Sequence, residues 1–195
     1  MKKVLLLALF IVAAVWQHDQ NRVIDHGPGV LVSNAPVQRN LRSAPVIQHK
    51  GYDLKPQANF IVEARVLSRE KYFMDASSEL SPLDLALGWG EMSDTAVIEK
   101  LDINQSVRFY TWRMERATIS LQDVIRQSSN MHMIPANDQV AKQLGKIREG
   151  SLVRISGKLV NITSQSGFAW NSSVSRTDTG AGACEVIYVT GVSQF

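Results

Sequence analysis

One thiol and one imidazole are the side chains of this chain best suited to nucleophilic chemistry. Cys184 is the single cysteine, and His132 is a candidate base for it. A thiolate nucleophile needs a nearby imidazole to take its proton, and Asn130 could orient that ring, as in Cys-His-Asn enzymes. Glu185 follows Cys184 within an expected strand, however, and a negative neighbour disfavours the thiolate. The sequence therefore favours a small buried hydrophobic residue at Cys184 over a catalytic thiol.

Metal chemistry is suggested by the Met131-His132-Met133 triplet. Thioethers and imidazole suit copper, in particular Cu(I). In a regular strand, however, alternation directs the two methionines to one face and the histidine to the other. A core strand with a hydrogen-bonded histidine is the favoured interpretation. We therefore predict no metal and no cofactor.

A third candidate is the Asp178-Thr179-Gly180-Ala181 segment. It resembles the D-T-G-A motif of pepsin-like and retroviral aspartic proteases. That resemblance implies a homodimer, because the mechanism uses two carboxylates that share a proton. The segment before Asp178 is polar, whereas a hydrophobic strand delivers the aspartate in that family. A glycine-rich turn is the favoured interpretation.

Two further residues are candidates for ligand contact. Trp89 stands between Gly88 and Gly90 on an expected turn, where it could contact a ligand or cover the core. Tryptophan is mostly buried in folded proteins, so a place in the core is favoured. Arg176 precedes Asp178 closely and is the second candidate, together with His132.

The elements that must position these residues alternate between short helices and strands. The alternation of Phe60, Val62, Ala64 and Val66 predicts a half-buried strand. Capping residues predict four short helices, and apolar or alternating runs predict further strands. The helices are expected to start at Ser81 (with Pro82 and Asp84 in the first turn, ending at Gly88), Asp94, Ser120 and Asn137 or Asp138, and the strands to lie at 59–67, 107–114, 131–134, 152–162, 168–170 and 183–192.

The fold class expected from this pattern is α+β, with short helices on a mostly antiparallel sheet. Residues 149–157 also resemble the G-x-x-V-x-I-x-G strand of small barrels such as OB folds. Val153, Ile155, Leu159 and Ile162 cannot share one face without a bulge or bend, for which Gly157 is the expected place.

The N-terminus has the pattern of an export signal. Lys2 and Lys3 precede an apolar run over residues 4–16, which is typical of the charged and hydrophobic regions of a secretory signal. No Ala-x-Ala follows the run, so a cleaved signal peptide and an uncleaved inner-membrane anchor both remain open, and the anchor is favoured. Both place the rest of the chain outside the cytoplasm, and the periplasm is the expected compartment.

Three parts follow from this organisation. Residues 1–16 form the signal peptide or anchor, residues 17–57 an extended arm or linker, and residues 58–195 a single α+β domain. The arm is expected because Pro28, Pro36, Pro45 and Pro56 recur through it, and each proline favours extended geometry before it.

Charge argues against nucleic acid as a partner. The chain carries a net charge of +3, but residues 51–195 hold 15 basic and 16 acidic residues. A nucleic-acid-binding domain is expected to carry its own basic patch. The expected partners are the inner membrane, through residues 4–16, and another envelope protein.

The motifs SPLDLALGWGEMSD, NMHMIPA and DTGAGACEVIYV occur in this order over roughly residues 50–192. They resemble a family of uncharacterised bacterial envelope proteins. The resemblance implies a single exported domain and implies no activity.

Two classes of function compete. The favoured one is an exported, membrane-tethered binding or assembly module of the bacterial cell envelope, not an enzyme, because each catalytic set in the sequence lacks a member or has unsuitable flanks. The alternative is a periplasmic hydrolase that uses His132 with Cys184 or Asp178. Convergence of these three residues in one cleft would favour the hydrolase.

Overall fold

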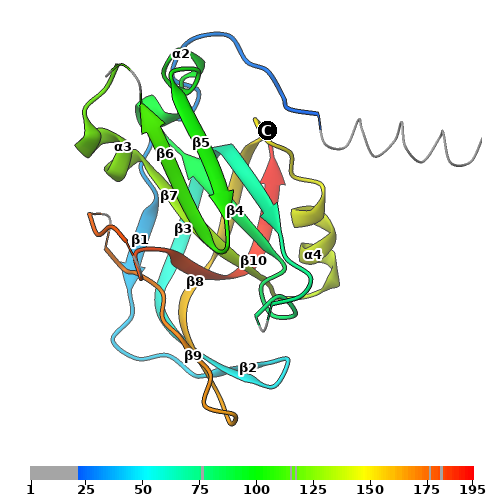
Figure 1. The fold of residues 1–195 in the computed structure, drawn as a ribbon. Helices are drawn as coiled ribbons and strands as arrows, with labels where there is room; N and C mark the ends of the chain where they lie inside the picture. The colour runs from blue at the N-terminus through cyan, green and yellow to red at the C-terminus, as the bar shows by residue number, and fades with distance from the viewer. Residues whose placement is uncertain (1–21, 76, 115, 117, 176, 181) are drawn as a thin grey trace, which may run out of the picture.

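The computed structural model describes residues 22–75, 77–114, 116, 118–175, 177–180 and 182–195 (Figure 1). The described part is mostly sheet, with 46% of its residues in strands and 14% in short helices, and the sheet is largely antiparallel. This agrees with α+β in the coarse sense. The strands are β1 (Val37–Asn40), β2 (Ile47–His49), β3 (Tyr52–Lys71), β4 (Leu83–Gly88), β5 (Leu101–Ser106), β6 (Phe109–Met114), β7 (Ser128–Pro135), β8 (Leu152–Ser164), β9 (Ala169–Trp170) and β10 (Glu185–Gln194). The helices are the 3₁₀ turn η1 (Gly90–Ser93), α2 (Thr95–Ile98), α3 (Leu121–Gln127) and α4 (Asp138–Gly145).

Strand pairing in the main sheet runs through β3, β4, β7, β10 and β8 and then returns to β3. The return is possible because β3 is 20 residues long and pairs with β8 along its first part and with β4 along its last. Only β7 and β10 pair in parallel among these five. The main hydrophobic core lies on one face of these strands and includes Phe60, Leu85, Met131, Ile155 and Ile187.

A separate hairpin, β5–β6, covers part of the opposite face (Figure 1). Its partly buried Tyr110 and Trp112 pack with Ala86 of β4 in a smaller cluster. Its two-residue turn is Val107-Arg108, and both residues have positive φ, 49° and 66°. A primed turn of this kind normally takes Asn or Gly, and a β-branched residue there is an outlier. The hairpin tip is therefore held in an unfavourable backbone geometry by its surroundings.

The segment expected to be an arm makes specific contacts with the rest of the fold. The Ile24 N–H donates to the Glu149 carbonyl, and the Val32 N–H donates to the Ser93 hydroxyl. Val32 is buried in the main core. The expected boundary at residue 58 lies inside β3, which begins at Tyr52.

One predicted element is wrong. Residues 83–88 form strand β4 and not a helix from Ser81. Leu83, Leu85 and Leu87 alternate into the core, and pairing with β3 and β7 on both sides outweighs the local helix-start signal. The helix starts at Asp94, Ser120 and Asn137 are confirmed, because each of these side chains accepts a capping hydrogen bond.

Glycine is required at position 157 for another reason than the expected bulge or bend in its strand. Strand β8 runs through it without a break, and the register shifts lie in the partner strands β3 and β10. A Cβ at Gly157 would stand 2.2 Å from the Tyr188 carbonyl oxygen. The glycine therefore permits close approach of two backbones.

No helix within the described part of the chain is long and apolar enough to cross a membrane. The predicted anchor at residues 4–16 lies outside the described residues.

Candidate functional site

Three neighbouring strands bring Asp84, His132 and Cys184 together. Asp84 on β4 and His132 on β7 are direct cross-strand partners. The residues on either side of them, such as Leu85 and Met131, point into the main core, so alternation directs Asp84 and His132 to the opposite face. Cys184 directly precedes β10, whose Val186 is the parallel partner of His132.

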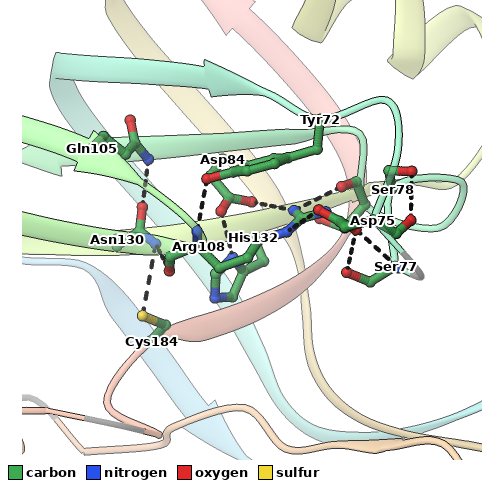
Figure 2. Close-up of polar contacts among 11 residues, drawn as sticks. Tyr72, Asp75, Ser77, Ser78, Asp84, Gln105, Arg108, Asn130, His132 and Cys184 are labelled. Carbon is green, nitrogen blue, oxygen red and sulfur yellow. Dashed lines mark hydrogen bonds and ion pairs between the residues drawn. The ribbon is translucent and has the colours of Figure 1, made fainter.

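Asp84 is the centre of a buried ionic network (Figure 2). Its side chain is fully buried, and its Oδ1 accepts a hydrogen bond from Arg108 Nη1 at 2.9 Å. Its Oδ2 lies 2.9 Å from His132 Nδ1. Neither Asp84 Oδ2 nor His132 Nδ1 has a hydrogen-bond partner with good alignment, so the contact between them is close but bent. Contacts of catalytic groups are often poorly aligned before a substrate binds.

Arg108 fixes the hairpin tip to this network. Its guanidinium reaches both Asp84 and Asp75, at 2.9 Å each, and lies 3.7 Å above the Tyr72 ring. Its backbone N–H donates to the Tyr72 hydroxyl at 2.9 Å. These contacts explain how the strained turn persists, since backbone strain is retained where surrounding contacts over-determine it.

Cys184 lies beside His132 and under an oriented amide. Asn130 Nδ2 donates to the Arg108 carbonyl at 3.0 Å and also points at Cys184 Sγ at 3.7 Å (Figure 2). Gln105 Nε2 donates to Asn130 Oδ1 at 2.6 Å. With both ends of its amide engaged, Asn130 directs an N–H at the sulfur.

The proton affinity of His132 is set by these neighbours. Burial lowers the pKa of His132, but its close contact with the Asp84 carboxylate and, to a lesser degree, its interaction with Cys184 raise it, and the net pKa lies above the ordinary value. The side chain is 3% exposed. Cys184 and His132 line the same pocket, which places the thiol on the same side of the sheet as the ring. The raised pKa favours the protonated imidazole over a wider pH range than an ordinary histidine allows.

The network opens into a pocket of about 450 Å³. Its lining includes Arg108, His132, Trp170 and Cys184. The rings of His132 and Trp170 are in contact, with centroids 4.5 Å apart. A second, smaller pocket of about 160 Å³ also reaches Cys184. Cys184 therefore lines both pockets.

The other predicted site residues lie apart from this group. Asp178 lines the smaller pocket, and its Oδ2 accepts a hydrogen bond from the Ser173 hydroxyl at 2.6 Å. Trp89 is 2% exposed within the main core and does not line either pocket at Cys184. Arg176 lies outside the described residues. The carboxylate at His132 is thus Asp84 and not Asp178.

Sequence reasoning missed Asp84, Arg108 and Trp170. A signal was present for the first: Asp84 interrupts an alternating apolar run, Leu83 to Leu87, and a charge inside a buried strand requires a partner. The roles of Arg108 and Trp170 depend on how their loops fold back, which no local pattern indicates.

Within the described residues, no group of three or more His, Cys, Asp and Glu side chains could hold a metal ion. No family model, no curated protein and no solved structure matches this chain. The resemblance to envelope proteins stays a prediction, and the function must be argued from the site.

Proposed function

We propose that this protein is a cysteine-dependent hydrolase of acyl bonds, with Cys184 as nucleophile, His132 as base and Asp84 as the residue that positions the imidazole. The observation that carries the proposal is that Asp84 lies 2.9 Å from His132, and that His132 and Cys184 line one pocket. Nucleophile, base and orienting carboxylate are the parts that covalent acyl transfer requires.

The reaction follows from the positions. His132 takes the thiol proton, and the Cys184 sulfur attacks the carbonyl carbon of an amide or ester. The bond to the leaving amine or alcohol breaks, and that group receives the proton from His132, which leaves a thioester on Cys184. Water then attacks the thioester and gives one proton to His132. The carboxylic acid departs, and the proton returns to the sulfur.

The orientation of the Asn130 side-chain amide supports this chemistry. Its amide N–H points at the sulfur, so it lies near the place where the carbonyl oxygen of a bound acyl group would become negative. A preorganised amide donor stabilises such an oxyanion. Burial of Asp84 and the cover of Trp170 reduce access of water to the imidazole.

The proposal is tested by looking for a covalent acyl group on Cys184. The purified full chain is mixed with p-nitrophenyl acetate, and the expected result is a burst of nitrophenolate with an acetyl group on Cys184 by mass spectrometry. Cys184→Ala and His132→Gln, each shown to be folded by circular dichroism, should lack both. A folded wild-type protein that forms no acyl adduct, or an equal adduct in His132→Gln, would overturn the proposal.

A binding module remains the second candidate, and the strand order supports it. The order β3-β4-β7-β10-β8, closing on β3, with α4 between β7 and β8, which are the third and fourth of these strands in chain order, supports an OB-like barrel as the finer description of the fold. OB folds bind ligands on the face of their second and third strands, between two loops. Here that face carries Asp84 and His132, and Ser77 and Trp170 from the two loops line the larger pocket. This argument is one of fold analogy, and it predicts that Cys184→Ala retains function.

The place of action is part of the same proposal. We infer an exported protein held in the inner membrane by residues 4–16, with its domain in the periplasm and another envelope protein as partner. The support is the charged start and apolar run of the sequence. Fractionation with N-terminal sequencing tests it: a soluble cytoplasmic protein with an intact N-terminus would contradict export, and a mature N-terminus near residue 15 would replace the anchor by a cleaved signal.

A further inference from the structure

We propose that the smaller pocket beside Cys184 binds a cationic ammonium group, so that the preferred substrates of the proposed hydrolase are acyl compounds that carry one. The claim that the bound cation belongs to a substrate rests on the proposed function. The binding site itself is argued only from the residues that line the pocket.

The charge in this pocket is negative. Asp178 is the one charged side chain among the described residues that line it, which are otherwise aromatic, small or neutral polar: Phe109, Tyr110, Trp112, Ile125, Ser128, Ser129, Asn130, Thr179, Gly180, Ala183 and Cys184. Asp178 forms no ion pair with a basic residue in the described part of the chain. Its carboxylate is held in place by the Ser173 hydroxyl. Among the described residues this fixed carboxylate has no basic partner, and it favours a cation in the space before it.

The walls of the pocket favour the same charge. Phe109, Tyr110 and Trp112 all belong to β6, and all three line the pocket. Burial raises the pKa of Tyr110 to about 12, and the hydrogen bond with Ser128 opposes the shift only in part, so its ring stays a neutral phenol. Aromatic faces attract ammonium groups through the ring quadrupole, and cages of such rings recognise quaternary ammonium ligands.

The size of the pocket limits the ligand to a small group. Its volume is about 160 Å³, close to a cavity of roughly 150 Å³ that holds one benzene molecule. A trimethylammonium or a primary ammonium on a short chain fits this space. Cys184 and Phe109 line both pockets, so a ligand with its cation here would extend past the sulfur into the larger pocket. The acyl bond would then lie over Cys184.

Binding alone tests the site. Choline is titrated into the full-length, ¹⁵N-labelled protein while the indole N–H signal of Trp112 is followed, and 3,3-dimethylbutan-1-ol, its neutral isostere, is titrated in parallel. We expect choline to shift the Trp112 signal and to bind about fivefold more tightly than the isostere. Asp178→Asn should reduce this preference and leave only the part that the aromatic rings contribute. Asp102→Asn, an acid on the same hairpin that is paired with Arg113, is the matched control and should retain the full preference. Equal binding of the two ligands, or an unmoved Trp112 signal, would overturn the proposal.

Reaction rates separate this inference from the proposed function. Acetylthiocholine and its neutral isostere, S-(3,3-dimethylbutyl) thioacetate, are compared as acyl donors to Cys184. The expected ratio of kcat/KM is about fivefold in favour of the cationic donor, and it should be smaller in Asp178→Asn. A ratio near one in a protein that does acylate Cys184 refutes the cation site alone. A choline preference without any acylation refutes the hydrolase and leaves a binding pocket.

Discussion

Replacing Asp84 by asparagine removes the charge that joins Arg108 to His132. The carboxylate is fully buried and lies 2.9 Å from both the Arg108 guanidinium and the His132 imidazole. Loss of one partner from a buried ion pair typically costs about 3–5 kcal/mol, because the other charge is left buried without compensation. Arg108 keeps its contact with Asp75, and its side chain is 16% exposed. We therefore expect a loss of about 3 kcal/mol in the free energy of unfolding, at the lower end of that range.

The loss should depend on pH. The pKa of His132 in the folded protein is raised above its ordinary value of 6.5. Its stabilising contribution is therefore fully present below pH 6.5 and is lost as the pH rises through the folded pKa. Since Asp84 contributes to the raised value, Asp84→Asn should reduce this pH dependence. The difference between wild type and variant should thus be larger at acidic than at alkaline pH.

Urea unfolding of both proteins at about pH 6 and about pH 9 measures this directly. Asp102→Asn is the control, because its ion pair with Arg113 is 66% and 80% exposed on the two side chains. Exposed pairs contribute about 0.5 kcal/mol or less. If Asp84→Asn cost no more than Asp102→Asn at both pH values, the claim that Asp84 centres a buried network would be wrong.

Two further predictions concern β8 and the Trp170 contact. Gly157→Ala should destabilise the fold by about 3 kcal/mol, because the new Cβ would stand 2.2 Å from the Tyr188 carbonyl oxygen. The control in thermal unfolding is Gly145→Ala, whose new Cβ meets no heavy atom within 4 Å. Equal melting temperatures of the two variants would contradict the close approach of the backbones at Gly157. The fluorescence of Trp170, whose ring lies 4.5 Å from that of His132, should be quenched as the imidazole gains its proton, with a midpoint above pH 6.5; a midpoint below this value, or an unchanged transition in Trp170→Phe, would refute it.

The parts of the fold that sequence predicts well are those with local causes. The helix starts at Ser120 and Asn137 follow from capping by a side chain a few residues away, and both caps form. Alternation around Phe60 predicts its strand because a half-buried strand shows its own period. The same local logic fails at Ser81-Pro82, where a helix-start pattern precedes strand β4. Pairing with two neighbouring strands decides that segment, and the sequence does not reveal its partners.

The candidate site divides in the same way. His132 and Cys184 are visible as residue types able to do chemistry, and a strand at Met131–Ile134 is predicted correctly. The partner of His132 could not be predicted, because it depends on the register between β4 and β7. The contribution of Arg108 depends on a hairpin tip with positive φ at two residues. Asn or Gly normally marks such a turn in a sequence, and neither is present at this tip.

The reactivity of Cys184 tests the central claim most directly. Because the chain holds a single cysteine, the rate of alkylation by iodoacetamide reports on this thiol alone. The thiolate is the reacting species, so a thiol paired with the charged His132 should react about tenfold faster at neutral pH than the thiol of folded His132→Gln. Equal rates in the two proteins would contradict the assignment of His132 as the base of Cys184, and with it the proposed hydrolase.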